Sequence, residues 1–388
     1  MNDVFLNWHL GSTFGWGILG LNIFFNWAND RDVRPLMGQP ITRDGLGLID
    51  PLRLSRAYAA IEHSNRFLSA IAAEASGHTN VDAIVIDALG NDFAGSAYRG
   101  SRNVARCIFE STSLASAKAS LARYDELLVA SRWNAELITQ ATGRRASVIF
   151  EGVDTSLFCP GPKSGLMDAD KFYVFSGGKV EFRKGQDLVL LAFAKFAERH
   201  RDAVLVTAWH SIWPHLSVGF QGRLQSPLEL DAHGRLGVRD WAARNGIDAR
   251  SVIDVGLVPN AMMPSILREM DVALQPSRAE ACTSLPVKES MACCVPVIAA
   301  FNTGLKDLLD DDNALLLRSQ ASVGGGDAAT MQGWGESDVD EIVAALEFAY
   351  EDRERARALG MRSREWLIRH DRTWQAHARD LKQWLLSL

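Results

Sequence analysis

Short apolar runs alternate with longer amphipathic stretches along most of the chain. Such runs predict buried parallel strands, and the stretches between them predict crossover helices that cover a sheet. In the first part of the chain we expect strands at residues 4–8, 83–86, 104–109, 127–130 and 147–150. The second part repeats the pattern, with strands expected at residues 172–175, 203–207, 252–255, 272–274 and 297–299. The chain is therefore predicted to form two α/β units of similar construction.

The segment at residues 151–165, EGVDTSLFCPGPKSG, separates these two units. Its Pro-Gly-Pro run at residues 160–162 is typical of a linker. A chain of 388 residues with 47% hydrophobic composition is long enough for two domains, each with its own core. The tail at residues 372–388, RTWQAHARDLKQWLLSL, has the spacing of a closing amphipathic helix.

The stretch at residues 274–300, LQPSRAEACTSLPVKESMACCVPVIAA, places two carboxylates around a strand-to-helix turn. Pro286 is expected as the first helical residue, where a missing N–H does no harm. The backbone N–H groups of residues 283–285 then point from a helix N-terminus into the crevice at the strand ends, which is predisposed to bind phosphate. Glu280 precedes this anion site and Glu289 lies one turn into the helix.

A second group of charged residues lies about a hundred residues upstream, in FSGGKVEFRKGQDLVLLAFAKF at residues 175–196. Lys179 and Lys184 are five residues apart, after a short apolar strand and before an amphipathic helix. Two cations at this place are able to neutralise a diphosphate group.

Both segments resemble the donor-binding motifs of the retaining glycosyltransferases of family four (glycosyl transferases group 1). In that family two glutamates bracket a loop that ends in Leu-Pro and is followed by Met-Ala-Cys and Pro-Val. Here eight residues instead of seven separate Glu280 from Glu289, as in a minority form of the motif that has a threonine. Lys179 stands where the family usually has Arg, while Lys184 and Gly185 agree with it. A lysine supplies the charge without the bidentate fork of arginine.

The resemblance implies the GT-B architecture, in which two Rossmann-like domains face each other across a cleft. We expect an acceptor-side domain at residues 1–160 and a nucleotide-sugar domain at residues 161–372. The helix at residues 373–388 is expected to cross back onto the first domain, as it does in the family.

The same resemblance implies the chemistry. A retaining enzyme would move a sugar from a UDP- or GDP-sugar to a hydroxyl of a glycan, a lipid-linked or a small-molecule acceptor, as in polysaccharide biosynthesis, with no metal or other cofactor. The departing diphosphate would be stabilised by Lys179 and Lys184, while Glu280 orients the donor sugar and Glu289 the ribose. Further donor contacts are expected from Gly178, Cys282, Thr283, Ser284 and Leu285, and acceptor or cleft-loop contacts from Gly15, Trp16, Gly17 and Glu110.

Three local patterns allow more than one interpretation. The Gly-x-Gly-x-x-Gly at residues 15–20 is separated from the preceding strand by six residues, which is wrong for a dinucleotide fingerprint. Its loop either faces the cleft or only lets the helix pack close to the sheet. Glu110 either contacts the acceptor hydroxyl or caps the next helix. Ser131 is expected as a helix N-cap. The connection at residues 209–236 is either an apolar loop over the cleft or structural padding.

Composition excludes several other classes. A formal net charge of −6 offers no basic stripe for nucleic acid, and there is no polybasic amphipathic helix, so membrane contact would be peripheral at most. Five cysteines without a Cys-x-x-Cys unit suggest neither zinc nor a disulfide framework and fit a cytoplasmic protein. The uncharged stretch at residues 4–29 is broken by glycines, and we expect a strand, loop and helix there instead of a membrane span. Asp-Ala-Asp at residues 168–170 and the acidic run at residues 310–313 are expected to be a solvated linker and a turn.

Two other functions remain open from the sequence. The first is a non-catalytic nucleotide-sugar-binding subunit. It stays open because the loop lacks the glycines that are common in the family and because position 179 is a lysine. A GT-B nucleotide-sugar epimerase would need a general-acid/base constellation that the sequence does not display.

Overall fold

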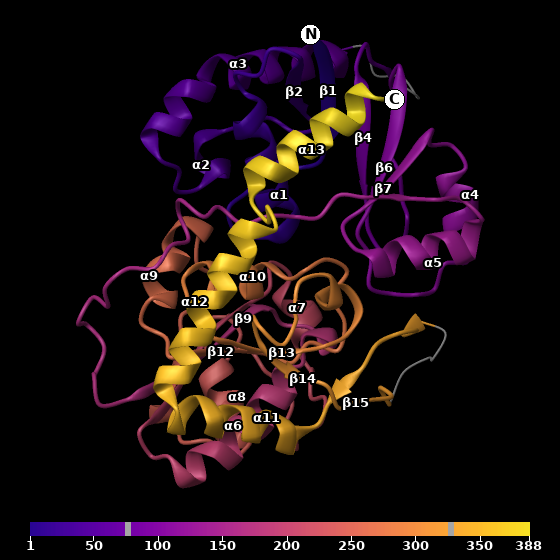
Figure 1. Cartoon of the computed structure of the whole chain (residues 1–388). Coiled ribbons are helices and arrows are strands. Elements are labelled where there is room, and N and C mark those ends of the chain that lie inside the picture. The colour runs from indigo at the N-terminus through magenta and orange to yellow at the C-terminus, as the bar shows by residue number, and fades with distance from the viewer. Residues whose placement is uncertain (74–78, 325–329) are drawn as a thin grey trace.

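The computed structural model describes residues 1–73, 79–324 and 330–388. It contains two six-stranded parallel sheets, one from each part of the chain, stacked one above the other in Figure 1. The predicted architecture of two α/β units, each with a parallel sheet, is confirmed. The chain passes from one sheet to the other between residues 148 and 172, and the expected domain boundaries stay predictions.

The first sheet has the strand order β2-β1-β4-β6-β7-β8. Every strand expected in this part is present. Sequence analysis missed β2, an edge strand whose Pro35 is tolerated because an edge strand has one side without a partner. The strands are β1 Asn2–Asn7, β2 Val33–Met37, β4 Ile84–Leu89, β6 Arg102–Cys107, β7 Glu126–Val129 and β8 Ser147–Val148, with a separate pair β3 Thr79–Asn80 and β5 Tyr98–Arg99. The helices are α1 Gly15–Trp27, α2 Arg43–Leu46, α3 Pro51–Ala73, α4 Ala117–Leu121 and α5 Arg132–Thr142.

The second sheet has the order β11-β10-β9-β12-β13-β14 and contains all five expected strands. Its two faces are covered by apolar cores built around α6 and α10. The strands are β9 Phe172–Lys179, β10 Ala203–His210, β11 Val252–Asp254, β12 Val272–Gln275, β13 Val297–Ala300 and β14 Leu315–Leu317, with a short hairpin of β15 Gln320–Ala321 and β16 Glu336–Ser337. The helices are α6 Gln186–Arg199, α7 Pro214–Ser217, α8 Val238–Arg244, α9 Met263–Leu267, α10 Leu285–Ala292, α11 Val339–Glu351, α12 Arg353–Arg369 and α13 Trp374–Leu386.

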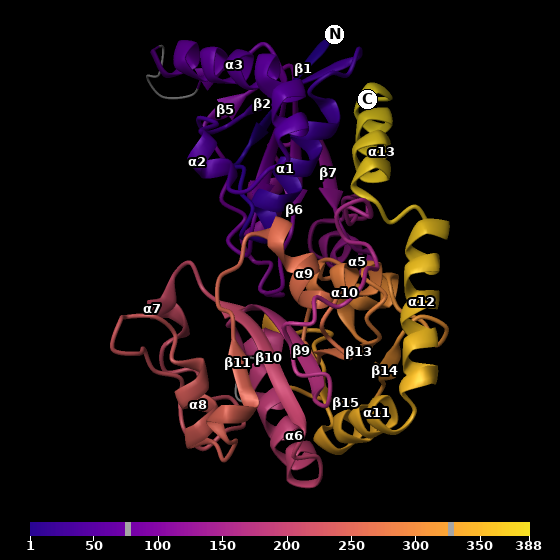
Figure 2. The same ribbon diagram turned by 90° about the vertical axis from the view of Figure 1, so that its left-hand side faces the viewer.

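The C-terminal helices run along one side of the molecule, opposite α7 and α8 in Figure 2. Helix α12 lies on the second unit, and α13 returns to the first, where it packs against α1. The indole N–H of Trp27 donates to the carbonyl of Ala378 at 3.0 Å across this contact. The expected return of the last helix is thus observed.

The two chain crossings between the units lie side by side. Val153 pairs with Thr373 in a parallel bridge. A Cβ on Gly152 would lie 2.1 Å from the carbonyl carbon of Thr373, so only glycine allows the two segments to approach this closely. Within the described residues no helix is long and apolar enough to span a bilayer.

Candidate active site

A cavity of about 750 Å³ lies between the two units. It is lined by residues that follow the carboxyl ends of central strands in both sheets, for example Gly90 after β4, Ile108 after β6 and Lys179 at the end of β9. Open α/β sheets bind ligands at this edge. The cavity is therefore where the sequence motifs should meet.

Most of the residues singled out from the sequence line this cavity. They come from the two motif segments, from the loop before α1 and from the end of β6. The lining includes Gly15, Trp16, Glu110, Gly178, Lys179, Lys184, Glu280, Cys282, Ser284, Leu285 and Glu289. Thr283 and Gly17 are outside it. Gly17 instead lies against backbone, since a Cβ there would be 2.8 Å from Cα of Gly11.

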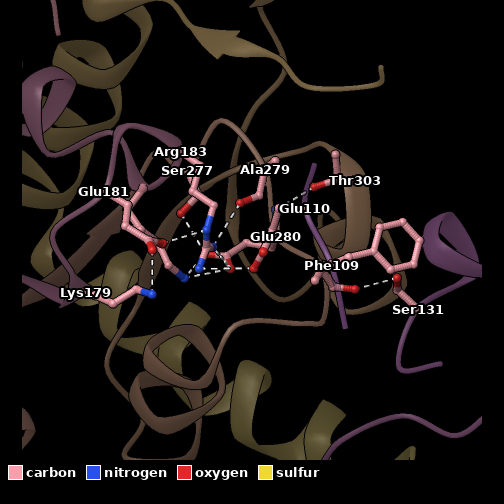
Figure 3. A network of polar contacts seen from close by, with 12 residues as sticks. Phe109, Glu110, Ser131, Lys179, Glu181, Arg183, Ser277, Ala279, Glu280 and Thr303 are labelled. Atoms are coloured by element: carbon pink, nitrogen blue, oxygen red, sulfur yellow. Dashed lines mark hydrogen bonds and ion pairs between the residues drawn. The ribbon is translucent and has the colours of Figure 1, made fainter. Parts of the chain in front are cut away.

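Glu280 is the most firmly held carboxylate of the cavity. Lys184 Nζ donates to both of its oxygens at 2.7 Å. The hydroxyl of Ser277 donates to Oε1 at 2.8 Å (Figure 3). Its backbone N–H donates to the hydroxyl of Thr303 at 2.9 Å. Burial raises the pKa of Glu280, but Lys184 and Arg183 outweigh burial and keep that pKa below its ordinary value. The side chain is therefore ionised and fixed in place.

Arg183 is the central cation of the site, and sequence analysis missed it. Its guanidinium contacts Glu181 at 2.8 Å, Glu110 at 3.1 Å and Glu280 at 3.3 Å. Burial lowers its pKa, but these three carboxylates together raise it above the ordinary value. The only signal in the sequence was its place directly before Lys184, which by itself does not separate a cavity cation from a surface one.

Glu110 connects the two units through the same arginine. Its backbone N–H donates to Asn91 Oδ1 at 2.9 Å, and its carbonyl accepts from the indole N–H of Trp334 at 3.0 Å. The next helix, α4, has Ser116 at its N-cap. The interpretation of Glu110 as a helix cap is therefore wrong, because its carboxylate is engaged by Arg183 across the cavity. Its contact with an acceptor stays a prediction.

The loop before α10 has a constrained backbone. Helix α10 begins at Leu285, so Pro286 is its second residue and not its first as expected. Both positions lack an intrahelical partner for an N–H, which is why proline is accepted at either. Ser284 takes a φ of 55°, a region that non-glycine residues enter at a cost of about 1–3 kcal/mol. Its hydroxyl, at the cavity wall, has no hydrogen-bond partner among the described residues.

Ser131 fulfils its predicted role and adds a second one. Its hydroxyl accepts from the backbone N–H of Asn134 at 3.2 Å, which makes it the N-cap of α5. The same hydroxyl donates to the carbonyl of Ala281 at 2.6 Å. The loop of the second unit that precedes α10 is thereby tied to the first unit.

The connection at residues 209–236 reaches the cavity. Ile212 and Trp213, just before α7, are part of the lining. Lys179 Nζ lies 5.5 Å from the ring centroid of Trp213, within the range of a cation–π contact. Of the two interpretations left open, the structure favours an apolar loop at the cleft. In the described part of the chain, no cluster of three or more His, Cys, Asp or Glu side chains is arranged to hold a metal ion.

Glu289 differs from Glu280 because none of the cations in the described part of the chain forms an ion pair with its carboxylate. Asn260 Nδ2 donates to Glu289 Oε1 at 2.5 Å. Burial raises the pKa of this carboxyl to about 7, only partly opposed by Asn260 and by Lys288. Near neutral pH this carboxyl group is therefore partly protonated.

Unfolding measurements at different pH values should detect this buried carboxyl. The folded state binds the proton of Glu289 more tightly than the unfolded chain, in which the pKa of this carboxyl is 4.5. The protonated group contributes roughly 3 kcal/mol to the free energy of unfolding. This contribution is complete below pH 4.5 and is lost as the pH rises to about 7. Urea unfolding at pH 4.5, 6 and 8 should show this loss in the wild type and not in Glu289→Gln. Equal pH dependence in both proteins would contradict the assignment.

The comparisons with known proteins agree with this geometry. Residues 259–381 match the model of the family described as family 4 glycosyltransferase in conflict systems. Sucrose-phosphate synthase from Thermosynechococcus elongatus has a similar structure, with a TM-score of 0.66, 16% identity, and 100% of this chain and 99% of that chain covered. HepE from Anabaena, solved in complex with UDP and glucose, gives a TM-score of 0.66 at 14% identity, with both chains covered completely. A glycosyltransferase from Rickettsia africae gives 0.61 at 11% identity, covering 98% of this chain and 97% of that chain. No curated protein sequence matches the chain.

Proposed function

We propose that the protein is a retaining, metal-independent glycosyltransferase, on the premise that residues 259–381 match the family 4 glycosyltransferase model and that the whole chain has a GT-B fold. In the proposed reaction a nucleotide-diphosphate sugar is the donor and a hydroxyl group is the acceptor. The observation that carries the proposal is that both lysines and both glutamates of the two motifs line one cavity.

In the proposed enzyme the cavity has a donor side and an acceptor side. Lys179, Lys184 and the N-terminus of α10 come from the second unit and offer positive charge to a diphosphate. Glu289 would accept hydrogen bonds from the ribose and Glu280 from hydroxyls of the sugar. HepE has been solved with UDP-glucose, which supports a UDP-sugar as donor, with a GDP-sugar as the other nucleotide to test.

The acceptor side is formed by the first unit. Glu110 and the loop containing Gly15 and Trp16 face the donor side across the cavity. In the proposed retaining reaction an oxygen of the departing phosphate takes the acceptor proton on the same face of the sugar. The protein then contributes position and preorganised charge, which together account for much of the acceleration in such enzymes.

A nucleotide-binding panel tests the proposal. Calorimetry with UDP, GDP, ADP and their glucose conjugates, without metal and then with Mg²⁺ or Mn²⁺, should show binding of one nucleotide that does not require metal. Glu289→Ala should weaken that binding about tenfold or more, because the ribose loses its hydrogen-bond acceptor. Glu198→Ala, an exposed change on α6, is the control and should leave binding unchanged. The transferase proposal fails if no nucleotide binds to the wild type.

Retention and transfer require a second measurement. Once a donor is known, NMR of the transferred sugar should show the same anomeric configuration as in the donor, with EDTA leaving the rate unchanged. Inverted product would refute the retaining mechanism, and donor consumption to an epimer without any acceptor would favour the epimerase alternative.

A further inference from the structure

Glu181 bridges two cations at the donor side of the cavity. Its Oε1 lies 2.5 Å from Lys179 Nζ, and its Oε2 lies 2.8 Å from Arg183 Nε (Figure 3). The residue follows the end of β9 and precedes the 3-10 turn Phe182–Lys184. It also lines the cavity. A carboxylate of the protein thus lies between two of the cations that a donor diphosphate would need.

The charges of this cluster cancel. The cluster contains three cationic side chains and three carboxylates, and each cation contacts at least one carboxylate. The cations are Lys179, Arg183 and Lys184, and the carboxylates are Glu110, Glu181 and Glu280. A nucleotide-diphosphate sugar brings about two further negative charges. Placing these in a partly desolvated cleft is unfavourable unless cations become free to pair with them. At least one of the three carboxylates must therefore leave its cation when a diphosphate binds.

Glu181 is the most exposed of the three carboxylates. Its side chain is 31% exposed, compared with 17% for Glu110 and 6% for Glu280. Glu280 has Lys184 and the Ser277 hydroxyl as aligned donors, so moving it would leave those groups unpaired. The contact of Glu181 Oε2 with Arg183 is close, yet Oε2 forms no aligned hydrogen bond within the described residues. Of the three carboxylates, Glu181 is therefore the one whose displacement toward solvent requires the smallest change in burial.

On the basis of the proposed function, we propose that Glu181 is an internal counter-ion that competes with the donor diphosphate. Donor binding displaces its carboxylate from Lys179 and Arg183, and these two cations then pair with the phosphate oxygens. Arg183 thereby supplies the guanidinium fork that lysine at position 179 cannot provide. When the nucleoside diphosphate leaves, Glu181 returns to the cations and favours release of the product.

If Glu181 competes with phosphate, removing its charge tightens ligand binding, whereas most substitutions in a binding site weaken it. Glu181→Gln removes the competing charge but keeps the size of the side chain, so both cations become available to phosphate. Binding of UDP or GDP, whichever binds to the wild type, and of inorganic diphosphate should tighten about tenfold in calorimetry. Binding of the corresponding nucleoside, which has no phosphate, should not change. A residue with only a structural role would give weaker or equal binding of all these ligands.

Two further variants complete the experiment. Glu181→Asp has a shorter side chain that reaches the cations less well, and should give a smaller tightening in the same direction. It also replaces the glutamine variant if that variant does not fold. Glu198→Gln on α6 is the matched exposed control and should bind like the wild type.

The outcomes separate this proposal from the proposed function. If the wild type binds a nucleotide and neither Glu181 variant binds it more tightly, the counter-ion role is overturned while the donor site stands. If the wild type binds neither nucleotide nor inorganic diphosphate, the donor site itself is refuted, and the counter-ion role with it.

Discussion

Replacing Lys184 by methionine is expected to lower kcat for sugar transfer about a hundred- to a thousandfold. Loss of one preorganised donor at developing charge typically costs about 3–4 kcal/mol of transition-state stabilisation. Lys184 Nζ is held by both oxygens of Glu280 at 2.7 Å, so the ammonium group is already positioned before the donor arrives. Initial-rate kinetics with the donor identified by calorimetry would measure the effect.

The matched control for this change is Lys195→Met. Lys195 lies on α6, the helix that follows Lys184. Its side chain is half exposed and pairs with Asp340 on the surface. Its replacement should leave kcat within about twofold, because exposed pairs contribute little. A Lys184 variant that keeps full kcat while circular dichroism shows a native fold would contradict the assigned role in stabilising the leaving group.

The second large effect concerns stability. Arg278→Met is expected to lower the free energy of unfolding by about 3–5 kcal/mol, because it leaves a buried carboxylate without its cation. The side chains of Arg278 and Asp187 are both fully buried, and the guanidinium donates to the two carboxylate oxygens at 2.8 and 2.7 Å. The guanidinium also lies 4.1 Å from the ring centroid of Phe182, the residue that directly precedes Arg183. Urea denaturation followed by circular dichroism would measure the loss.

Two comparisons show whether buried charge is the cause. Asp187→Asn combined with Arg278→Met removes both charges and should restore part of the lost stability, since no unpaired charge remains. Arg278 also pairs with Glu336, and so does Arg223, whose side chain is 59% exposed. Because of this exposure, Arg223→Met should lower the free energy of unfolding by less than about 1 kcal/mol. If the double variant is less stable than Arg278→Met alone, the explanation is wrong.

The periodicity of the chain was enough to predict both sheets. Strands such as β4 and β13 are short apolar runs between helical segments, and a run of this kind is stable only when a parallel sheet buries it on both faces. The edge strand β2 was missed because Pro35 and Arg34 interrupt its apolar pattern, and edge strands tolerate both. Local motifs likewise placed Glu280 and Glu289 on either side of the start of α10.

Contacts between segments distant in the chain were not available from that pattern. Arg183 reaches Glu110, 73 positions earlier in the sequence, and the pKa of Glu289 near 7 results from burial, which Asn260 only partly opposes. The sequence by itself determined the two α/β units, the two charged motif segments and the charges they bring, because strand burial and turn chemistry depend on neighbouring residues. Only the tertiary structure decided which charges pair, which stay buried and which face the cavity, because electrostatic energy depends on distances and desolvation that folding alone establishes.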